Sequence, residues 1–210
     1  MSVVKEDKTN LSSRVYSYLR ERLINHELVP GDMLVRRDVA AKLGVSVAPV
    51  LEAFVQLESE GYIESIPRVG TRVRSVRMED VRGQLLVREA LECQAARLYC
   101  GKTVAQHESA LYRLAEDIQR TTHTPRGNWR AEVRFHHELV SLAQVPFLTK
   151  EFDRITKLGL FMQVSMIVAD DPEIESSNHV QLITDLQTTN PDEAERLIRS
   201  HIRMGKADLL

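Results

Sequence analysis

The stretch RRDVAAKLGVSVAPVLEAFVQLESEGYIESIPRVGTRVR, residues 36–74, decides the fold of the first third of this chain. It contains two helical patterns, separated by Gly44, and Ser46 is a residue type that caps the start of the second helix. Two β-rich segments follow, at 62–65 and 70–74, and the turn residues between them indicate a hairpin. Helix, turn, helix and hairpin in this order indicate a winged helix–turn–helix.

Helical patterns also occupy the chain on both sides of this stretch. An apolar repeat starts at Leu11 and predicts a preceding helix that ends near 29–31. From Met78 onward we find no strand pattern, and we expect helices at about 78–101, 104–122, 128–143, 147–168, 177–189 and 192–205. The expected fold is therefore mainly α. A winged helix–turn–helix of three helices and a β-hairpin wing, residues 8–76, precedes an all-α antiparallel helical bundle, residues 78–210.

The composition excludes several classes of protein. With 43% hydrophobic and 28% charged residues, the 210-residue chain has the composition of a soluble globular protein. Its net charge of −2 gives no indication of nucleic acid, so any basic surface must be local. We find no apolar run of the ~18 residues that a membrane span needs, and no signal peptide pattern. Cys93 and Cys100 lie seven apart in one helical pattern, which favours reduced packing residues and a cytoplasmic protein without a membrane partner.

Residues 28–73 resemble the N-terminal domain of the GntR family of bacterial transcription regulators. The shared residues are Pro30-Gly31, Leu43-Gly44-Val45-Ser46, Pro49-Val50, Glu52-Ala53, Leu57, Glu60-Gly61 and Gly70. The remainder is similar to the FCD-type effector domain of the FadR-like branch, with Arg88, Glu92, Glu132 to His136, His179 and His201 as its marks. The resemblance implies a regulator, expected to be a repressor and not an enzyme. It also implies binding to double-stranded operator DNA as a homodimer.

The expected recognition helix departs from the family at two positions. The family turn usually reads V-S-R-x-P-V-R-E-A, and Val47 and Leu51 stand here in place of its two arginines. Residues four apart share a helix face, so both changes fall on the surface expected to touch DNA. We expect phosphate anchoring by the flanking arginines Arg36, Arg37, Arg68, Arg72 and Arg74, with Ser46, Val47, Ala48, Leu51 and Gly70 completing the interface. Val47, Ala48 and Leu51 would then meet thymine methyl groups.

Two other interpretations of this departure remain open. In one, DNA affinity is weak for a single chain and rises through dimerisation or a second site. In the other, this protein does not bind DNA.

Three histidines fall on inward-facing apolar stripes of separate expected helices. His136 lies four residues after Glu132, and His179 and His201 belong to stripes of their own. A single such histidine is usually a core residue, but burying three together is costly unless something compensates. Three imidazoles and one carboxylate form a good ligand set for a divalent transition metal, zinc first, with nickel, manganese or iron as alternatives. The resemblance implies the same four ligands, with Glu132 where the family usually has Asp.

Arg88 lies on an inward face of the first helix of the bundle and therefore needs a partner. Glu92, four residues later, can supply it. The resemblance instead implies that Arg88 binds the carboxylate of a small organic-acid effector whose other oxygens reach the metal. Two alternative functions use the same residues: a regulator that senses the metal ion itself, and a metal-dependent hydrolase.

Overall fold

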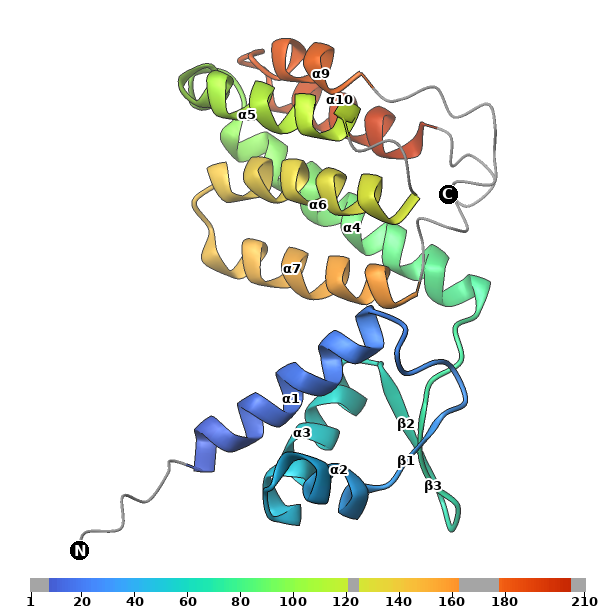
Figure 1. The fold of residues 1–210 in the computed structure, drawn as a ribbon. Helices are drawn as coiled ribbons and strands as arrows, with labels where there is room; N and C mark the ends of the chain where they lie inside the picture. The colour runs from blue at the N-terminus through green and yellow to red at the C-terminus, as the bar shows by residue number, and fades with distance from the viewer. Residues whose placement is uncertain (1–7, 121–124, 163–177, 205–210) are drawn as a thin grey trace, which may run out of the picture. The chain divides into compact units, whose positions relative to one another are not determined.

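The computed structural model describes residues 8–120, 125–162 and 178–204, and the chain divides into two compact units, 1–77 and 78–210 (Figure 1). The fold is mainly α with one small antiparallel sheet, which confirms the expected fold class. Among the described helices, none is both long and apolar enough to cross a membrane.

The first unit is a winged helix–turn–helix. Its elements are α1 (Lys8–Ile24), β1 (Met33–Leu34), α2 (Arg36–Leu43), α3 (Val47–Ser59), β2 (Ile63–Ile66) and β3 (Gly70–Val73). Gly44 ends α2 with a left-handed conformation, φ 65°, which glycine adopts without steric cost. The predicted buried stripe of α3 is confirmed: Val50, Ala53, Phe54 and Leu57 are all buried. This packing leaves the opposite face of α3 on the surface.

The end of α1 differs from the expectation. The helix stops at Ile24, several residues before the predicted end. His26 takes a left-handed conformation, φ 56°, and the N–H groups of His26 and Glu27 donate to the carbonyls of Leu23 and Arg22. This is the hydrogen-bond pattern of a Schellman motif, which usually has glycine at the left-handed position. Histidine tolerates that conformation better than most residues. The helix therefore ends without a glycine, and the sequence gives no glycine signal at this boundary.

The sheet has three strands, one more than the expected hairpin. β2 and β3 pair in antiparallel register, with Glu64 opposite Arg72. The extra strand β1 pairs with the other edge of β3, giving the order β1-β3-β2. Two residues are too few for an alternating apolar pattern, so only the pairing across the sheet reveals this strand.

The second unit is helical in all the residues that the structure describes. Its helices are α4 (Met78–Tyr99), α5 (Lys102–Arg120), α6 (Pro125–Leu142), α7 (Pro146–Phe161), α9 (His179–Asp185) and α10 (Pro191–Arg203). α6 begins at Pro125, where we expected a break, because proline in a first turn gives up only an N–H that has no helical partner. α9 ends at Asp185, four residues earlier than expected. The last part of the helix expected at 147–168 lies outside the described residues.

The arrangement of these helices converges on α4. It packs against α6, α7 and α10, and in Figure 1 it runs diagonally behind α6. The core around it includes Tyr99, Leu111, Phe135, Phe152 and Ile198, all almost fully buried. α4 therefore brings side chains from α6 and α10 close to its own buried polar residues. Both cysteines are free thiols, as expected.

Candidate functional site

Four side chains from three helices meet inside the second unit. Glu132 and His136 come from α6, His179 begins α9, and His201 lies near the end of α10. One ligand atom from each lies within 4.8 Å of the others. The Glu132 carboxylate is 3.0 Å from Nε2 of His179 and 3.5 Å from Nε2 of His136. The structure thus brings together the whole ligand set that we expected from the sequence.

The three imidazole rings lie against one another in the interior. Ring centroids are 4.7 Å apart for His179 and His201, 5.2 Å for His136 and His201, and 5.9 Å for His136 and His179. All three residues are buried. Burial holds the pKa of His201 well below its usual value, and a positive charge on His136 or His179 would lower it further. His201 is therefore neutral at pH 7, and a neutral imidazole keeps a lone pair for a ligand bond.

This ligand set fits a divalent transition metal. Imidazole nitrogens and a carboxylate oxygen are ligands that zinc and related ions prefer. Burying three histidines and a glutamate in contact is costly unless hydrogen bonds or a bound cation compensate. The Glu132 carboxylate contacts His136 and His179, and His201 makes ring contacts with both of these histidines. The residues present therefore match what a bound ion would require.

Glu92 of α4 contacts the cluster through His136. Its carboxylate accepts a 2.6 Å hydrogen bond from Nε of Arg88 and also contacts Nδ1 of His136. Burial by itself would raise the pKa of Glu92, but the charges of His136 and Arg88 outweigh it and lower this pKa to about 2. A carboxylate on Nδ1 fixes the ring so that Nε2 faces the other ligands. Sequence analysis missed this contact, because Glu92 and His136 are 44 residues apart.

The structure bears on both interpretations of Arg88. The expected pair with Glu92 is present, and both side chains are buried. Because Glu92 also contacts His136, the guanidinium lies one carboxylate away from the histidine cluster. Arg88 is thus placed beside the four ligands.

The other histidines that the structure describes are separate from the cluster. His137, the neighbour of His136, is half-buried and lies 3.3 Å from Asp153 of α7. His107 is exposed, and its ring nitrogen contacts the carbonyl of Thr103 one turn earlier. His26 ends α1 on the surface, and His123 lies outside the described residues.

The outer face of α3 is apolar and exposed. Val47 and Leu51 are 43% and 46% exposed, and Val55 continues the same line one turn further along. Ala48 is exposed beside them, as is Ser46 at the N-cap position. The Ser46 backbone is extended, but its hydroxyl makes no capping bond with the first turn. The two positions that depart from the family therefore lie on the surface of the helix.

The five flanking arginines have different surroundings. Nη2 of Arg36 is 3.3 Å from the Thr71 hydroxyl, and its guanidinium lies 5.6 Å from the centre of the Phe54 ring. Arg72 pairs with Glu64 across the hairpin at 2.8 Å. Their charges are thus already engaged inside the first unit.

Of the other three arginines, one packs against the base of the wing and two are exposed. The guanidinium of Arg74 packs against Gly61 at the base of the wing. Arg37 is exposed at the start of α2. Arg68 is exposed in the wing turn with φ 66°, and Gly70, φ 139°, follows it. A side chain at Gly70 would be strained in this conformation and would also press on Met33.

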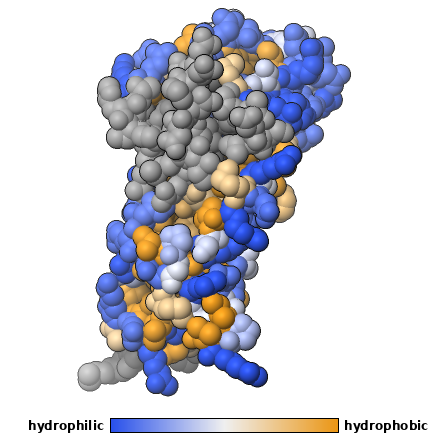
Figure 2. Space-filling model, turned by 90° about the vertical axis from the view of Figure 1, so that its right-hand side faces the viewer, coloured by the Kyte–Doolittle hydropathy of each residue, from blue (hydrophilic) through white to orange (hydrophobic). Residues whose placement is uncertain are grey.

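Apolar side chains also reach the surface around the wing. Met33, Val35 and Val69 are exposed. Figure 2 shows one face of the molecule, on which hydrophobic and hydrophilic surface alternate over the first unit. Apolar and basic side chains are therefore mixed on this unit.

Comparison with known proteins identifies both units. Residues 11–73 match the family described as bacterial regulatory proteins, gntR family, and residues 85–204 match the FCD domain. The chain is similar to the HTH-type transcriptional repressor RspR of Escherichia coli K12, with 25% identity over 92% of this chain and 86% of that protein. It is also similar to the Nta operon transcriptional regulator of Aminobacter aminovorans, with 23% identity over 86% of this chain and 85% of that protein.

Two solved structures show the same fold. A GntR protein from Rhodococcus sp. RHA1 superposes with a TM-score of 0.71 and 22% identity, over 94% of this chain and 96% of that one. Escherichia coli McbR/YncC gives a TM-score of 0.65 and 19% identity, over 95% and 96%. These families and relatives are transcriptional regulators and not enzymes, which excludes the hydrolase interpretation. The chain therefore belongs to the GntR family of bacterial transcription regulators, with an FCD domain as its second unit.

Proposed function

We propose that this regulator is a repressor whose operator affinity is set by a small organic acid bound at a metal centre in the second unit. The observation that carries the proposal is the convergence of Glu132, His136, His179 and His201 within 4.8 Å. FCD domains are commonly metal-binding, which supports the same conclusion. Zinc suits this ligand set, and nickel, manganese and iron share the preference for imidazole and carboxylate.

Arg88 is the proposed anchor for the effector. A bound metal would supply a Lewis-acidic position for one carboxylate oxygen of the effector. The planar guanidinium of Arg88 suits a second carboxylate group, because its N–H groups form a fork that matches two oxygens. The contact of Glu92 with both Arg88 and His136 links the proposed anchor to the ligand cluster. A di- or tricarboxylic acid therefore suits the site better than a neutral molecule.

On the DNA side, the proposal is that α3 reads methyl groups and shape while arginines of α2 and the wing anchor phosphates. Val47 and Leu51 present apolar surface where the family has arginines, and Ala48 is exposed between them. Thymine is the base with a methyl group in the major groove. Arg37 and Arg68 are exposed, and we place them on phosphates. Arg36 and Arg72 would have to exchange their present partners to take part.

A homodimer is part of the proposal. One face of α4 exposes apolar and small side chains over four turns. They are Gly83, Leu86, Val87, Ala90 and Leu98. A two-fold axis would cover this face with its own copy and place two α3 helices on two half-sites, which predicts a palindromic operator.

The proposal is tested by measuring operator binding of the cytoplasmic regulator as purified, with fragments of its own upstream DNA. Metal-loaded protein is titrated with operator, with and without acetate, succinate or citrate, and the titration is repeated after chelation. The double variant His179→Ala, His201→Ala serves as the metal-free control, and metal content is measured for both proteins. An effector can change operator affinity only if it binds the two DNA-binding states differently.

We expect wild-type protein with about one metal ion per chain, and an acid that changes operator affinity only when the metal is present. Equal metal content in the wild type and the double variant would refute the metal centre. Release of the operator by chelation alone, with no response to any acid, would favour a regulator that senses the metal itself. Equal affinity for operator and random DNA would refute specific DNA recognition.

A further inference from the structure

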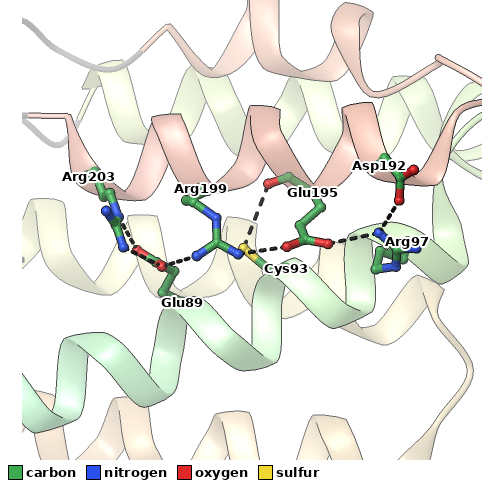
Figure 3. Close-up of polar contacts among 7 residues, drawn as sticks. All are labelled: Glu89, Cys93, Arg97, Asp192, Glu195, Arg199 and Arg203. Atoms are coloured by element: carbon green, nitrogen blue, oxygen red, sulfur yellow. Dashed lines mark hydrogen bonds and ion pairs between the residues drawn. The ribbon is translucent and has the colours of Figure 1, made fainter.

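A row of polar contacts joins α4 to α10 (Figure 3). From α4 it uses side chains spaced four apart, and from α10 side chains spaced three or four apart, so each set lies on one helix face. The members are Glu89, Cys93 and Arg97 of α4, and Asp192, Glu195, Arg199 and Arg203 of α10. We call this row the α4–α10 seam.

The two ends of the seam differ in burial. At one end, the Glu89 side chain is only 4% exposed and accepts three hydrogen bonds. Arg203 donates two of them as a fork, at 2.6 and 2.9 Å, and Arg199 donates the third at 2.6 Å. These bonds hold the pKa of Glu89 below its usual range despite its burial. The side chains of Arg199 and Arg203 are 41% and 44% exposed, but the carboxylate that they share is buried. Because its hydrogen bonds are charge-assisted and one arginine binds it as a fork, this end resists rotation or sliding of α10 more than a pair with an exposed carboxylate would.

The other end of the seam is exposed. Arg97 is 35% exposed and contacts Asp192 and Glu195 at 2.6 and 2.8 Å. Exposed pairs of this kind contribute little, because water screens them and the side chains lose freedom. Between the ends, Cys93 donates a weak hydrogen bond to the Glu195 carbonyl at 3.7 Å. Among the polar contacts of the seam, those of Glu89 therefore join α4 to the C-terminal end of α10 through a buried carboxylate.

The buried end of the seam flanks a ligand of the cluster. His201 is two residues after Arg199 and two before Arg203, and each residue turns the helix by ~100°. His201 therefore leaves α10 on the side opposite the two arginines. Any rotation of α10 that loosens Glu89 from Arg199 and Arg203 moves the His201 ring relative to α6 and α9.

α4 carries a second carboxylate that acts on the cluster, within one turn of Glu89. Two glutamates of α4 thus influence two of the three histidines: Glu92 contacts His136 directly, and Glu89 contacts the helix that carries His201. We propose that Glu89 is a positioning residue for the metal centre, which sets the rotation of α10 and so the place of His201.

This inference rests on the proposed metal centre for one of its two readouts. The variant is Glu89→Gln, which keeps the shape of the side chain and removes its charge, and Glu89→Asp is the conservative rescue. The matched control is Arg97→Gln, which breaks the exposed end of the same seam. Arg203→Gln, at an exposed position, replaces Glu89→Gln if that variant fails to fold.

The first readout is metal affinity, measured by competition with a chelator, together with the absorption spectrum of the cobalt-loaded protein. We expect Glu89→Gln to weaken affinity roughly tenfold, at the lower end for residues that orient metal ligands. The cobalt spectrum should change in the same variant. Glu89→Asp should recover part of the affinity, and Arg97→Gln should match the wild type in both measurements.

The second readout needs no metal. In metal-stripped protein, the imidazole NMR signals of His201, assigned with His201→Gln, should shift in Glu89→Gln and stay in place in Arg97→Gln. Wild-type affinity and spectrum in Glu89→Gln would overturn the inference even if that variant were less stable. A wild-type protein that binds no metal would refute the proposed function, while unmoved His201 signals would refute the positioning role independently.

Discussion

Replacing Glu92 by glutamine should strongly destabilise the second unit even without a metal. The side chains of Arg88 and Glu92 are 3% and 2% exposed, so little water can reach the guanidinium when the charge of Glu92 is removed. Removing one member of a buried ion pair costs about 3–5 kcal/mol. Glu92 offers a separate acceptor oxygen to Arg88 and to Nδ1 of His136, whereas glutamine has one acceptor oxygen, so one of the two donors also loses its acceptor.

Urea denaturation of metal-stripped protein measures this effect. Far-UV circular dichroism follows the unfolding, because the second unit is helical in all the residues that the structure describes. With a urea dependence of about 2 kcal/mol/M, the midpoint of Glu92→Gln should fall by about 2 M. The control is Glu116→Gln, which breaks an exposed pair with Arg120 in α5, where the glutamate is 57% exposed. Such pairs are worth about 0.3–0.5 kcal/mol.

A loss below about 1 kcal/mol in Glu92→Gln would refute the reasoning, because it would mean that the other contacts of Arg88, or water, compensate for the lost charge of Glu92. A loss equal to that of Glu116→Gln would have the same meaning.

Three further predictions concern DNA binding and pH. Leu51→Ala should weaken operator binding by about 1.5 kcal/mol, or about tenfold, for lost apolar burial; in an anisotropy titration, replacing thymine by deoxyuridine should cost the wild type as much and leave the variant unaffected. Arg68→Ala should lower the slope of log affinity against log salt by about 1, and an unchanged slope would remove Arg68 from the phosphate contacts. Hydrogen bonds from Arg203, opposed by burial, lower the folded-state pKa of Glu89. Its stabilising contribution should therefore be complete above the unfolded pKa of about 4.3 and be lost as pH falls through the folded value. In acid unfolding of metal-free protein, wild type and Glu89→Gln should differ above about pH 5 and converge as the pH falls below the folded-state pKa of Glu89; a constant difference would contradict this assignment.

Local patterns in the sequence predicted most of the fold. The buried stripe of α3, the hairpin and the six described helices of the second unit all came from apolar periodicity and from turn residues. The misplaced boundaries have local causes. At the end of α1, His26 takes the left-handed conformation that is usual for glycine. Pro125 is the first residue of α6, whereas we expected it to precede the helix. Sequence analysis did not predict β1, because a strand of two residues is too short to show an alternating apolar pattern.

For the candidate site, the sequence by itself determined which side chains face inward. The spacing of Glu132 and His136, and the stripes that hold His179 and His201, follow from helical geometry alone. The pairing of Arg88 with Glu92 could also be predicted, because four residues separate them in one helix.

Only the tertiary structure decided which inward faces meet. It placed Glu92 on His136, 44 residues away, and Glu89 on Arg199 and Arg203, 110 and 114 residues away. It also turned Arg72 toward Glu64 and Arg36 toward Thr71, two arginines that we had expected to be available for phosphates. A helical period fixes the direction of a side chain from its own axis, but the partner across the interface depends on how the helices pack.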